Sequence, residues 1–380
     1  MIKQFLISRK YKTEEVLTPY KLFSWGYNGN GQLGINNTTD QSSPNQVGSL
    51  TVWAKIDVGD YYMASVRDNN TLWTWGDNTY GELGQNDTTA RSSPTQMGSL
   101  TTWKSVACGN NHTLALKTDG TLWAWGYNGN GELGQNNNTN YSSAVQIGSA
   151  TNWSKISAGA NHCLAIKEDG TLWAWGANTA GETGHLTGYG IGVNGILTPT
   201  QVGSLTTWAE VSAGAYYSLA IKTDGTLWAW GDNQDGNLGT NNTTDYSSPV
   251  QSGAASNWKK VSTSLNGYGV YHVLGIKTDG TLWAWGNGDY GQIGDGDFIY
   301  YSSAVQIGTD TDWDDIAAGS GYSLAVKTNG TLWSWGYNEY GMLGDGSSGF
   351  SYTTFPTQVG ALTSWKKVAA GYYSSHALRT

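Results

Sequence analysis

A five-residue motif, Leu-Trp-x-Trp-Gly, constrains the fold of this chain more than any other feature. It occurs seven times, with phenylalanine replacing the first tryptophan in the first copy, and its second tryptophan lies at Trp25, Trp75, Trp125, Trp175, Trp230, Trp285 and Trp335. The spacing is 50 residues except for two intervals of 55. Periods of this length are typical of solenoids and propellers, in which each repeat is one supersecondary unit. The repeat therefore predicts the architecture and says much less about function.

A single repeat, followed from Trp103 to Gly148, predicts four short strands. Its apolar residues alternate with polar ones, and Asp119-Gly120 is typical of a tight hairpin turn because both residues tolerate positive φ. A loop rich in Gly, Asn and Thr separates the third strand from the fourth. We expect the strands at residues 103–107, 112–117, 122–126 and 144–148. Seven such units predict an all-β fold, a closed seven-bladed β-propeller with four short strands per blade.

The two ends of the chain predict how the ring closes. The last repeat stops at His376–Thr380, before its hairpin turn and third strand, and the first repeat begins with that missing strand, Leu22–Gly26. Pairing the N-terminal strand (residues 22–26) into the C-terminal blade completes the blade and leaves no exposed edge. A linear β-solenoid is the alternative, but its ends would need caps. We expect an N-terminal basic arm at residues 1–21 and one propeller over residues 22–380.

Two stretches of sequence carry a family resemblance. Gly159–Gly176, with its Asp-Gly turn and tryptophan strand, and Trp125–Gly134, which ends in Gly-Glu-Leu-Gly, resemble the regulator of chromosome condensation family of seven-bladed propellers. The resemblance covers all but about the first 20 residues and implies the same fold. Members of that family serve as nucleotide exchange factors, photoreceptors, enzyme inhibitors and structural parts, so the resemblance leaves the function open.

Residue types that repeat in register are interpreted as structural. The 20 tryptophans fall in three registers, which indicates packing within and between blades. His112, His162 and His272 share a position that other blades fill with Tyr or Ser, which indicates hydrogen-bonding anchors rather than metal ligands. The acidic runs 295–297 and 310–315 lack the spacing of a calcium loop. We find no catalytic triad, Walker loop or paired-histidine motif, and expect no enzyme activity, no metal and no cofactor.

Charge and composition narrow the partner classes. The net charge is −9. Residues 1–21 have a charge of +3 and the remainder −12, so an acidic propeller should repel phosphate backbones and bind no nucleic acid. There is no apolar run long enough for membrane insertion, and the apolar core near residue 5 is too short for a signal peptide. Charged residues make up 13% of the chain, against about 25% in an average domain, a composition that resembles extracellular or virion surfaces.

The arm and several aromatic loops are what the repeat does not explain. Insertions lie within Thr183–Pro199, Thr263–Tyr271 and Asp345–Phe355, and aromatic residues on loops of a rigid scaffold are typical of interfaces. An unstructured tail and the general abundance of tyrosine are the competing explanations. The candidate partner-binding residues are Phe5, Leu6, Ile7, Tyr11, Val16 and Leu17 in the arm and Tyr189, Ile191, Tyr268, Tyr271, Phe298, Tyr300, Tyr301, Phe350, Tyr352 and Phe355 in the loops.

These observations favour a non-enzymatic structural or interaction protein. We expect a peripheral component of a larger assembly such as a phage tail or capsid, anchored by its arm to virion proteins, with its loops contacting a host surface or glycan. Its expected location is the virion or the extracellular surface, with the cytoplasm as the fallback. One alternative is a secreted protein- or glycan-binding module, similar to enzyme inhibitors. The second is a guanine-nucleotide exchange factor for a small GTPase, although exchange would need a wedge longer than five-residue insertions provide.

Overall fold

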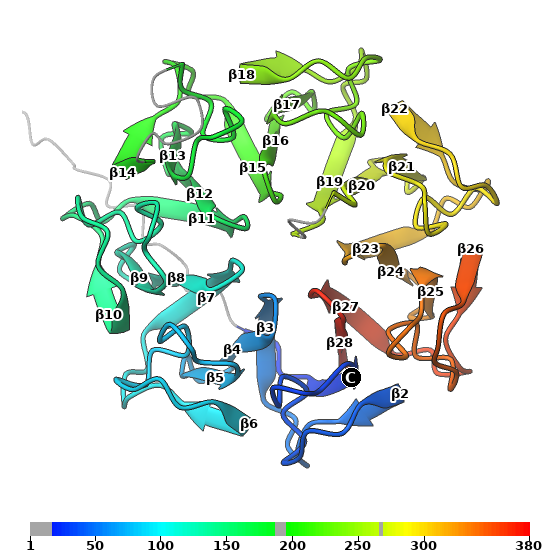
Figure 1. Cartoon of the computed structure of the whole chain (residues 1–380), viewed down its shortest axis with the longest axis horizontal. Coiled ribbons are helices and arrows are strands. Elements are labelled where there is room, and N and C mark those ends of the chain that lie inside the picture. Colours follow the sequence, from blue (N-terminus) through cyan, green and yellow to red (C-terminus); the bar gives the residue numbers. More distant parts are fainter. Residues whose placement is uncertain (1–16, 187–194, 266–268) are drawn as a thin grey trace, which may run out of the picture.

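Seven four-stranded antiparallel sheets form a closed ring in the computed structural model (Figure 1). The structure describes residues 17–186, 195–265 and 269–380. All regular elements within these ranges are strands, 28 in number. The predicted all-β, seven-bladed propeller is confirmed.

Each blade runs outward from a first strand at the central channel to a fourth strand at the rim. In blades 1 to 3 the strands are β3 (Trp53–Val58), β4 (Tyr62–Arg67), β5 (Leu72–Gly76), β6 (Arg91–Gln96); β7 (Trp103–Cys108), β8 (His112–Lys117), β9 (Leu122–Gly126), β10 (Tyr141–Gln146); and β11 (Trp153–Ala158), β12 (His162–Lys167), β13 (Leu172–Gly176), β14 (Ile196–Gln201). In blades 4 to 6 they are β15 (Trp208–Ala213), β16 (Tyr217–Lys222), β17 (Leu227–Gly231), β18 (Tyr246–Gln251); β19 (Trp258–Thr263), β20 (His272–Lys277), β21 (Leu282–Gly286), β22 (Tyr301–Gln306); and β23 (Trp313–Ala318), β24 (Tyr322–Lys327), β25 (Leu332–Tyr337), β26 (Tyr352–Gln358). Blade 7 combines β27 (Trp365–Ala370) and β28 (Ser374–Arg379) with β1 (Lys21–Gly26) and β2 (Gln41–Gln46).

The hairpin turn between the second and third strands follows from its sequence. In blade 2, Asp119 Oδ1 accepts hydrogen bonds from the backbone N–H of Thr121 at 2.9 Å and from its hydroxyl at 2.7 Å. Gly120 has φ +80°, which a side chain would disfavour. The fourth strand, in contrast, begins three residues before its predicted start at Ala144, because Tyr141 already pairs with Gly126 ahead of a β-bulge.

The ring closes as predicted. β1 pairs with β28 from Lys21↔Arg379 to Gly26↔Ser374, and blade 7 has the order β2-β1-β28-β27. The start of β1 and the end of β28 therefore lie where a seventh hairpin turn would stand. Tyr20 takes over the role of that turn: its N–H donates to the Trp53 carbonyl at 2.7 Å, and the Trp53 N–H donates back at 3.1 Å.

The tryptophans seal each junction between blades in the same way. The indole N–H of Trp125, which is fully buried, donates to the Glu82 carbonyl in the preceding blade at 2.8 Å. The equivalent bond at the closing junction runs from Trp25 to the Met342 carbonyl at 2.7 Å. All seven tryptophans of this register make the same contact, the other donors being Trp75, Trp175, Trp230, Trp285 and Trp335. The packing interpretation of this register is confirmed.

The histidine register also links neighbouring blades. His162 Nε2 lies 2.8 Å from Ser218 Oγ and His272 Nε2 lies 2.9 Å from Ser323 Oγ, each in the next blade. Burial lowers the pKa of both imidazoles to about 3, so they stay neutral. In this register His162 and His272 are anchors between blades, and each presents a nitrogen to a hydroxyl group.

Candidate functional site

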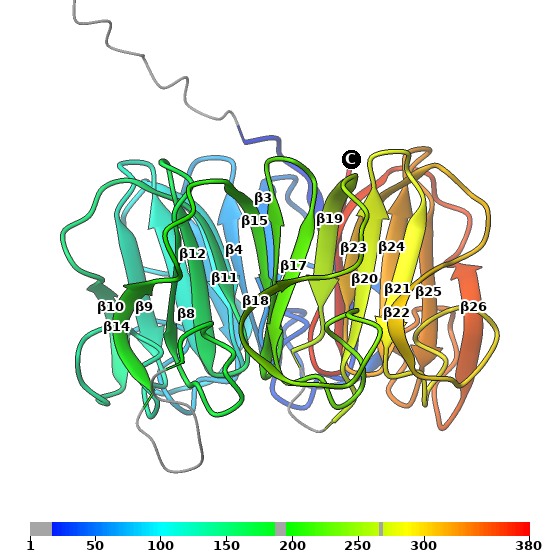
Figure 2. The ribbon, with the colours of Figure 1, turned by 90° about the horizontal axis from the view of Figure 1, so that it is seen from above.

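The propeller has two chemically different faces. We call the face that holds the connections between first and second strands, and between third and fourth strands, the loop face. The opposite face holds the hairpin turns and the links between blades, and we call it the turn face. Residues 17–20 leave the ring on the turn face, at the top of Figure 2, where Tyr20 contacts Trp53.

The connections between third and fourth strands are all acidic, and among the connections between first and second strands one contributes a further carboxyl group, that of Asp60. The amino-acid sequences of the loop-face connections contain no lysine and no arginine. They contain fifteen acidic residues: Asp40, Asp60, Asp77, Glu82, Asp87, Glu132, Glu182, Asp232, Asp235, Asp245, Asp289, Asp295, Asp297, Glu339 and Asp345. A face of this composition attracts cations and repels phosphate groups.

The cations gather at the other end of the strands. Of the sixteen lysines and arginines among the described residues, fifteen lie in the turn-face halves of strands, and they outnumber the eleven acidic residues of those strand halves and of the turn-face connections. Several lie over tryptophan rings; Lys117 Nζ, for example, is 3.6 Å from the centroid of Trp123. The protein is therefore electrically polarised through its thickness, with a negative loop face and a positive turn face.

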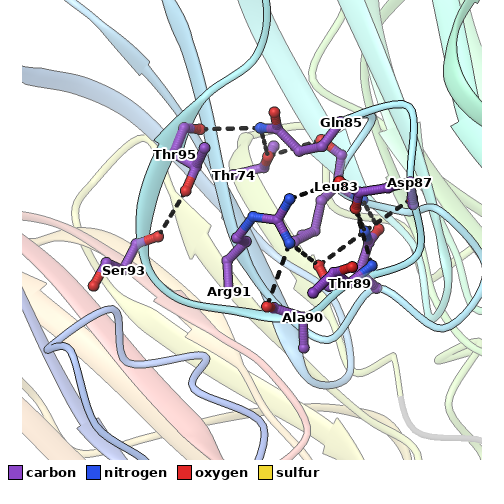
Figure 3. A network of polar contacts seen from close by, with 10 residues as sticks. Thr74, Leu83, Gln85, Asp87, Thr89, Ala90, Arg91, Ser93 and Thr95 are labelled. Atoms are coloured by element: carbon purple, nitrogen blue, oxygen red, sulfur yellow. Dashed lines mark hydrogen bonds and ion pairs between the residues drawn. The ribbon is translucent and has the colours of Figure 1, made fainter.

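Arg91 is the one described cation at the loop-face end of a strand, and it is neutralised locally (Figure 3). Its guanidinium donates to Asp87 at 2.7 Å and to the Thr89 carbonyl at 2.5 Å. Arg91 therefore does not offset the charge of the other loops.

Several loop-face carboxyl groups are buried enough to titrate near neutral pH. Burial, reinforced by the nearby charge of Asp77, raises the pKa of Glu82 to about 7. Burial and the neighbouring Asp245 raise the pKa of Asp232 to about 6. Glu82 also accepts a hydrogen bond from the Tyr80 N–H at 2.7 Å, so this carboxyl group shapes its own loop.

Five of the connections between third and fourth strands are each held by a buried asparagine. Asn128 Oδ1 accepts from the Leu133 N–H at 2.8 Å, and its amide donates to the carbonyls of Asn137 and Thr139 at 2.8 and 3.0 Å. Asn28, Asn78, Asn233 and Asn338 repeat the arrangement. The loop face is thus a set of well-positioned loops on a rigid ring, the usual setting of a binding site.

Aromatic rings concentrate on the part of the loop face formed by blades 5 and 6. Tyr290, Tyr337 and Tyr352 stack with centroid separations of 5.0 to 5.8 Å and interplanar angles of 17° to 30°. Phe298 meets Tyr352 edge-on at 6.0 Å, and Phe350 lies 6.4 Å from Tyr337. We call these five residues the aromatic patch.

The aromatic contacts continue into blade 7 and blade 1. Tyr373 lies 6.5 Å from Tyr337 and 4.9 Å from Tyr340, which in turn lies 5.1 Å from Tyr27. Tyr27 contacts Tyr61 at 5.9 Å. An unbroken chain of rings therefore crosses four blades of the acidic face.

The structure brings together some of the predicted partner-binding residues and separates others. Phe298, Phe350 and Tyr352 meet in the aromatic patch, and the Tyr300 hydroxyl donates to Asp289 at 2.5 Å. Tyr301 begins β22 opposite Gly286. Phe5, Leu6, Ile7, Tyr11, Val16, Tyr189, Ile191 and Tyr268 lie outside the described residues.

Three further predicted residues lie away from the patch. Leu17 is buried against the propeller itself, and Tyr271 is buried beside Tyr216 and Tyr217. Phe355 is exposed and lines a groove at the rim with Trp333. The division of the chain at residues 21 and 22 stays a prediction, as does partner binding by the candidate residues.

Sequence reasoning missed two tyrosines of the patch, Tyr290 and Tyr337, and two that extend the chain of rings beyond it, Tyr27 and Tyr340. Tyr290 and Tyr340 stand four residues after the glycine that ends a Trp-x-Trp-Gly strand, and Tyr27 and Tyr337 stand one residue after it. That recurrence is visible in the sequence and marks rings at the edge of successive blades.

The described residues contain no cluster of three or more His, Cys, Asp or Glu side chains arranged to hold a metal ion. Among them there is also no helix long and apolar enough to cross a membrane.

Comparison with known proteins agrees with the architecture. A family model described as "RCC1-like domain" matches residues 102–378, and a model of the regulator of chromosome condensation (RCC1) repeat matches residues 21–66 and 69–116. Prp20p of Saccharomyces cerevisiae, whose structure was described with its binding to Gsp1p and histones, superimposes with a TM-score of 0.80 at 21% identity, covering 96% of this chain and 92% of that one. Human WBSCR16 gives a TM-score of 0.82 at 19% identity, covering 95% and 99%. At these identities the likeness shows the fold.

Relatives with higher identity match over short segments. The ultraviolet-B receptor UVR8 of Arabidopsis thaliana is 34% identical over 91 residues, which are 24% of this chain and 20% of that protein. The human E3 ubiquitin-protein ligase HERC2 is 32% identical over 87 residues, which are 23% of this chain and 2% of that protein. The matched segments thus cover about a quarter of this chain and a fifth or less of these relatives.

These matches overturn two predictions. The prediction of a peripheral phage or virion component anchored by its arm is wrong, because the matches are to proteins such as Prp20p, which binds Gsp1p and histones, and UVR8. The predicted virion or extracellular location is wrong for the same reason, and nothing in the matches supports virion proteins or glycans as partners. The low content of charged residues misled both predictions, because it follows from seven copies of a Gly-, Asn- and Trp-rich repeat.

Proposed function

This chain belongs to the family of RCC1-like domains, and from that premise we propose that it is a regulatory protein-binding propeller whose loop face receives a protein partner. A small GTPase is the partner class that we favour, because the similar propeller Prp20p binds Gsp1p. We propose that the protein acts by binding, without covalent chemistry of its own.

The observation that carries this proposal is the polarity of the ring. Fifteen acidic residues and the exposed rings of Phe298, Phe350 and Tyr352 share one face, whereas fifteen of the sixteen described cations lie in the opposite halves of the strands. Aromatic side chains set in a charged surround are typical of protein interfaces. The acidic loops disfavour nucleic acid on this face, because they would repel its phosphates.

The first test is a comparison of two matched surface variants. The loop-face variant is Phe298→Ala/Phe350→Ala/Tyr352→Ala, and the turn-face control is Leu50→Ala/Leu205→Ala, which removes exposed apolar side chains from the opposite face. Each protein is immobilised and tested by surface plasmon resonance against a panel of small GTPases in GDP-bound, GTP-bound and nucleotide-free forms.

We expect at least one GTPase to bind the wild type and the control equally and the loop-face variant much more weakly. Release of fluorescent GDP from the bound GTPase then tests whether binding promotes exchange. Failure of the whole panel to bind would refute the GTPase as partner, and equal binding by all three proteins would refute the loop face as the binding surface.

A further inference from the structure

Exposed apolar side chains are concentrated in two adjacent loops of the propeller. Twelve large apolar or aromatic residues are exposed among the described residues, and five of them, Phe298, Ile299, Tyr300, Phe350 and Tyr352, lie within residues 298–300 and 350–352. Phe350 is 80% exposed and Phe298 52% exposed. Single exposed apolar residues are common, but a contiguous group marks an interaction surface.

The two connections that carry this group contain five carboxylates and no cation to pair with them. The connections 287–300 and 338–351 contain Asp289, Asp295, Asp297, Glu339 and Asp345 and no lysine or arginine. No ion pair found in the described part of the chain involves any of these five. Two of them are held against the rings, since Tyr300 donates to Asp289 and Tyr337 donates to Glu339.

The opposite face shows which side chain fits such a surface. There Lys222 Nζ lies 3.4 Å from the centroid of Trp228, and Lys277 Nζ lies 3.3 Å from that of Trp283. Ring faces attract cations through their quadrupole, and nearby carboxylates strengthen the attraction. The two loop-face connections of the aromatic patch have rings and carboxylates but no lysine or arginine to lie over the rings.

We infer that the aromatic patch and its five carboxylates bind arginine or lysine side chains in a basic segment of the protein partner. An apolar partner would bury the carboxylates without compensation, at a cost in desolvation. A basic segment pairs with them and places its aliphatic stems and cationic groups on Phe298, Phe350 and Tyr352. This inference rests on the proposed function only in assigning the loop face to a protein partner.

The test uses short fluorescent peptides with the full-length protein. One nine-residue peptide alternates Arg with Gly, a second alternates Lys with Gly, and a third replaces each Arg with citrulline, which is similar in shape but uncharged. Binding is measured by fluorescence anisotropy at several salt concentrations. The proteins are the wild type, the Phe298→Ala/Phe350→Ala/Tyr352→Ala variant, an Asp289→Asn/Glu339→Gln variant, and the Leu50→Ala/Leu205→Ala control.

We expect the arginine peptide to bind the wild type and the control alike, and the aromatic variant about tenfold more weakly, because that variant loses the rings that make the cation–π contacts. The citrulline peptide should not bind measurably, and the Asn/Gln variant should show a weaker salt dependence. Circular dichroism and thermal midpoints equal to wild type confirm that each variant is folded.

Two results would overturn the inference. If the aromatic variant bound the arginine peptide as well as wild type, the attraction would be the general field of the acidic face and not the patch. If the citrulline peptide bound as tightly as the arginine peptide, charge would play no part. Peptide binding that depends on the patch, combined with no binding by any GTPase, would retain the site and reject only the GTPase as partner.

Discussion

Asp57 provides a sharp test of the electrostatics of the central channel. Its carboxylate accepts a hydrogen bond from the Cys108 N–H of the next blade at 2.7 Å. Three other blades use serine at the same position, as in Ser157, whose hydroxyl accepts from the Ala213 N–H at 3.0 Å. Burial raises the pKa of Asp57 to about 7 from an ordinary 3.8. We therefore expect Asp57→Ser to preserve the junction and remove an unfavourable charge.

The direction of the stability change with pH follows from proton binding by Asp57. A carboxyl group with a raised pKa in the folded protein holds its proton more tightly there than in the unfolded chain, so its charge costs nothing at pH 4 and destabilises the fold as the pH rises toward 7. A shift of about three units corresponds to about 4 kcal/mol at 1.36 kcal/mol per unit. Because Asp57 keeps some contact with the channel, we take half of this value, about 2 kcal/mol.

The assay is thermal unfolding at pH 4 and pH 8. For a chain of this length, about 2 kcal/mol corresponds to a midpoint roughly 2–3 °C higher for Asp57→Ser at pH 8, and the gain should vanish at pH 4. Asp119→Asn is the control with the opposite sign, because hydrogen bonds from Thr121 lower the pKa of Asp119. A difference between Asp57→Ser and wild type that is the same at both pH values would refute the reasoning.

Other predictions concern closure and packing. Deletion of residues 1–26 removes β1 and should unfold the ring or make it dimerise, seen by light scattering, whereas deletion of residues 1–16 should leave the thermal midpoint unchanged. A monomeric, equally stable 1–26 deletion would contradict this. Trp125→Ala should cost about 3–5 kcal/mol in urea unfolding, and an unaffected midpoint would exclude its sealing role. A permutant that joins Thr380 to Leu22 through Asp-Gly-Thr, with new ends in the turn at Gly170, should fold with near wild-type stability; failure to fold would show that the turns are not equivalent.

The strands and the closure were predictable because both depend on register. Residues that recur at a fixed period in the sequence occupy the same position in each blade. Leu22–Gly26 could therefore be recognised as the strand that the last repeat lacks. The polarity of the faces was also present in the sequence, since successive connections alternate between faces. It was missed because charge was compared between the arm and the rest of the chain, not between one set of connections and the other.

The aromatic patch was only half predictable. Phe298, Phe350 and Tyr352 stood out because they interrupt the repeat, but their meeting with Tyr290 and Tyr337 depends on how loops of two blades lean toward each other. That geometry is set by packing between blades and has no signature within one repeat. The class of partner could not be predicted from composition for a related reason. Seven copies of one unit make the composition of the chain reflect that unit and not the binding surface.

The asparagine that holds five of the loops has a consequence for how the loops can vary. Asn128 fixes the start of its loop, and the Glu132 carbonyl at the far end of the tight turn is held by Trp175 of the next blade. Folding requires these fixed positions, whereas the side chains between them can be substituted without loss of the fold. A few substitutions between these fixed positions can therefore change which ligand a loop binds, while the propeller fold stays the same.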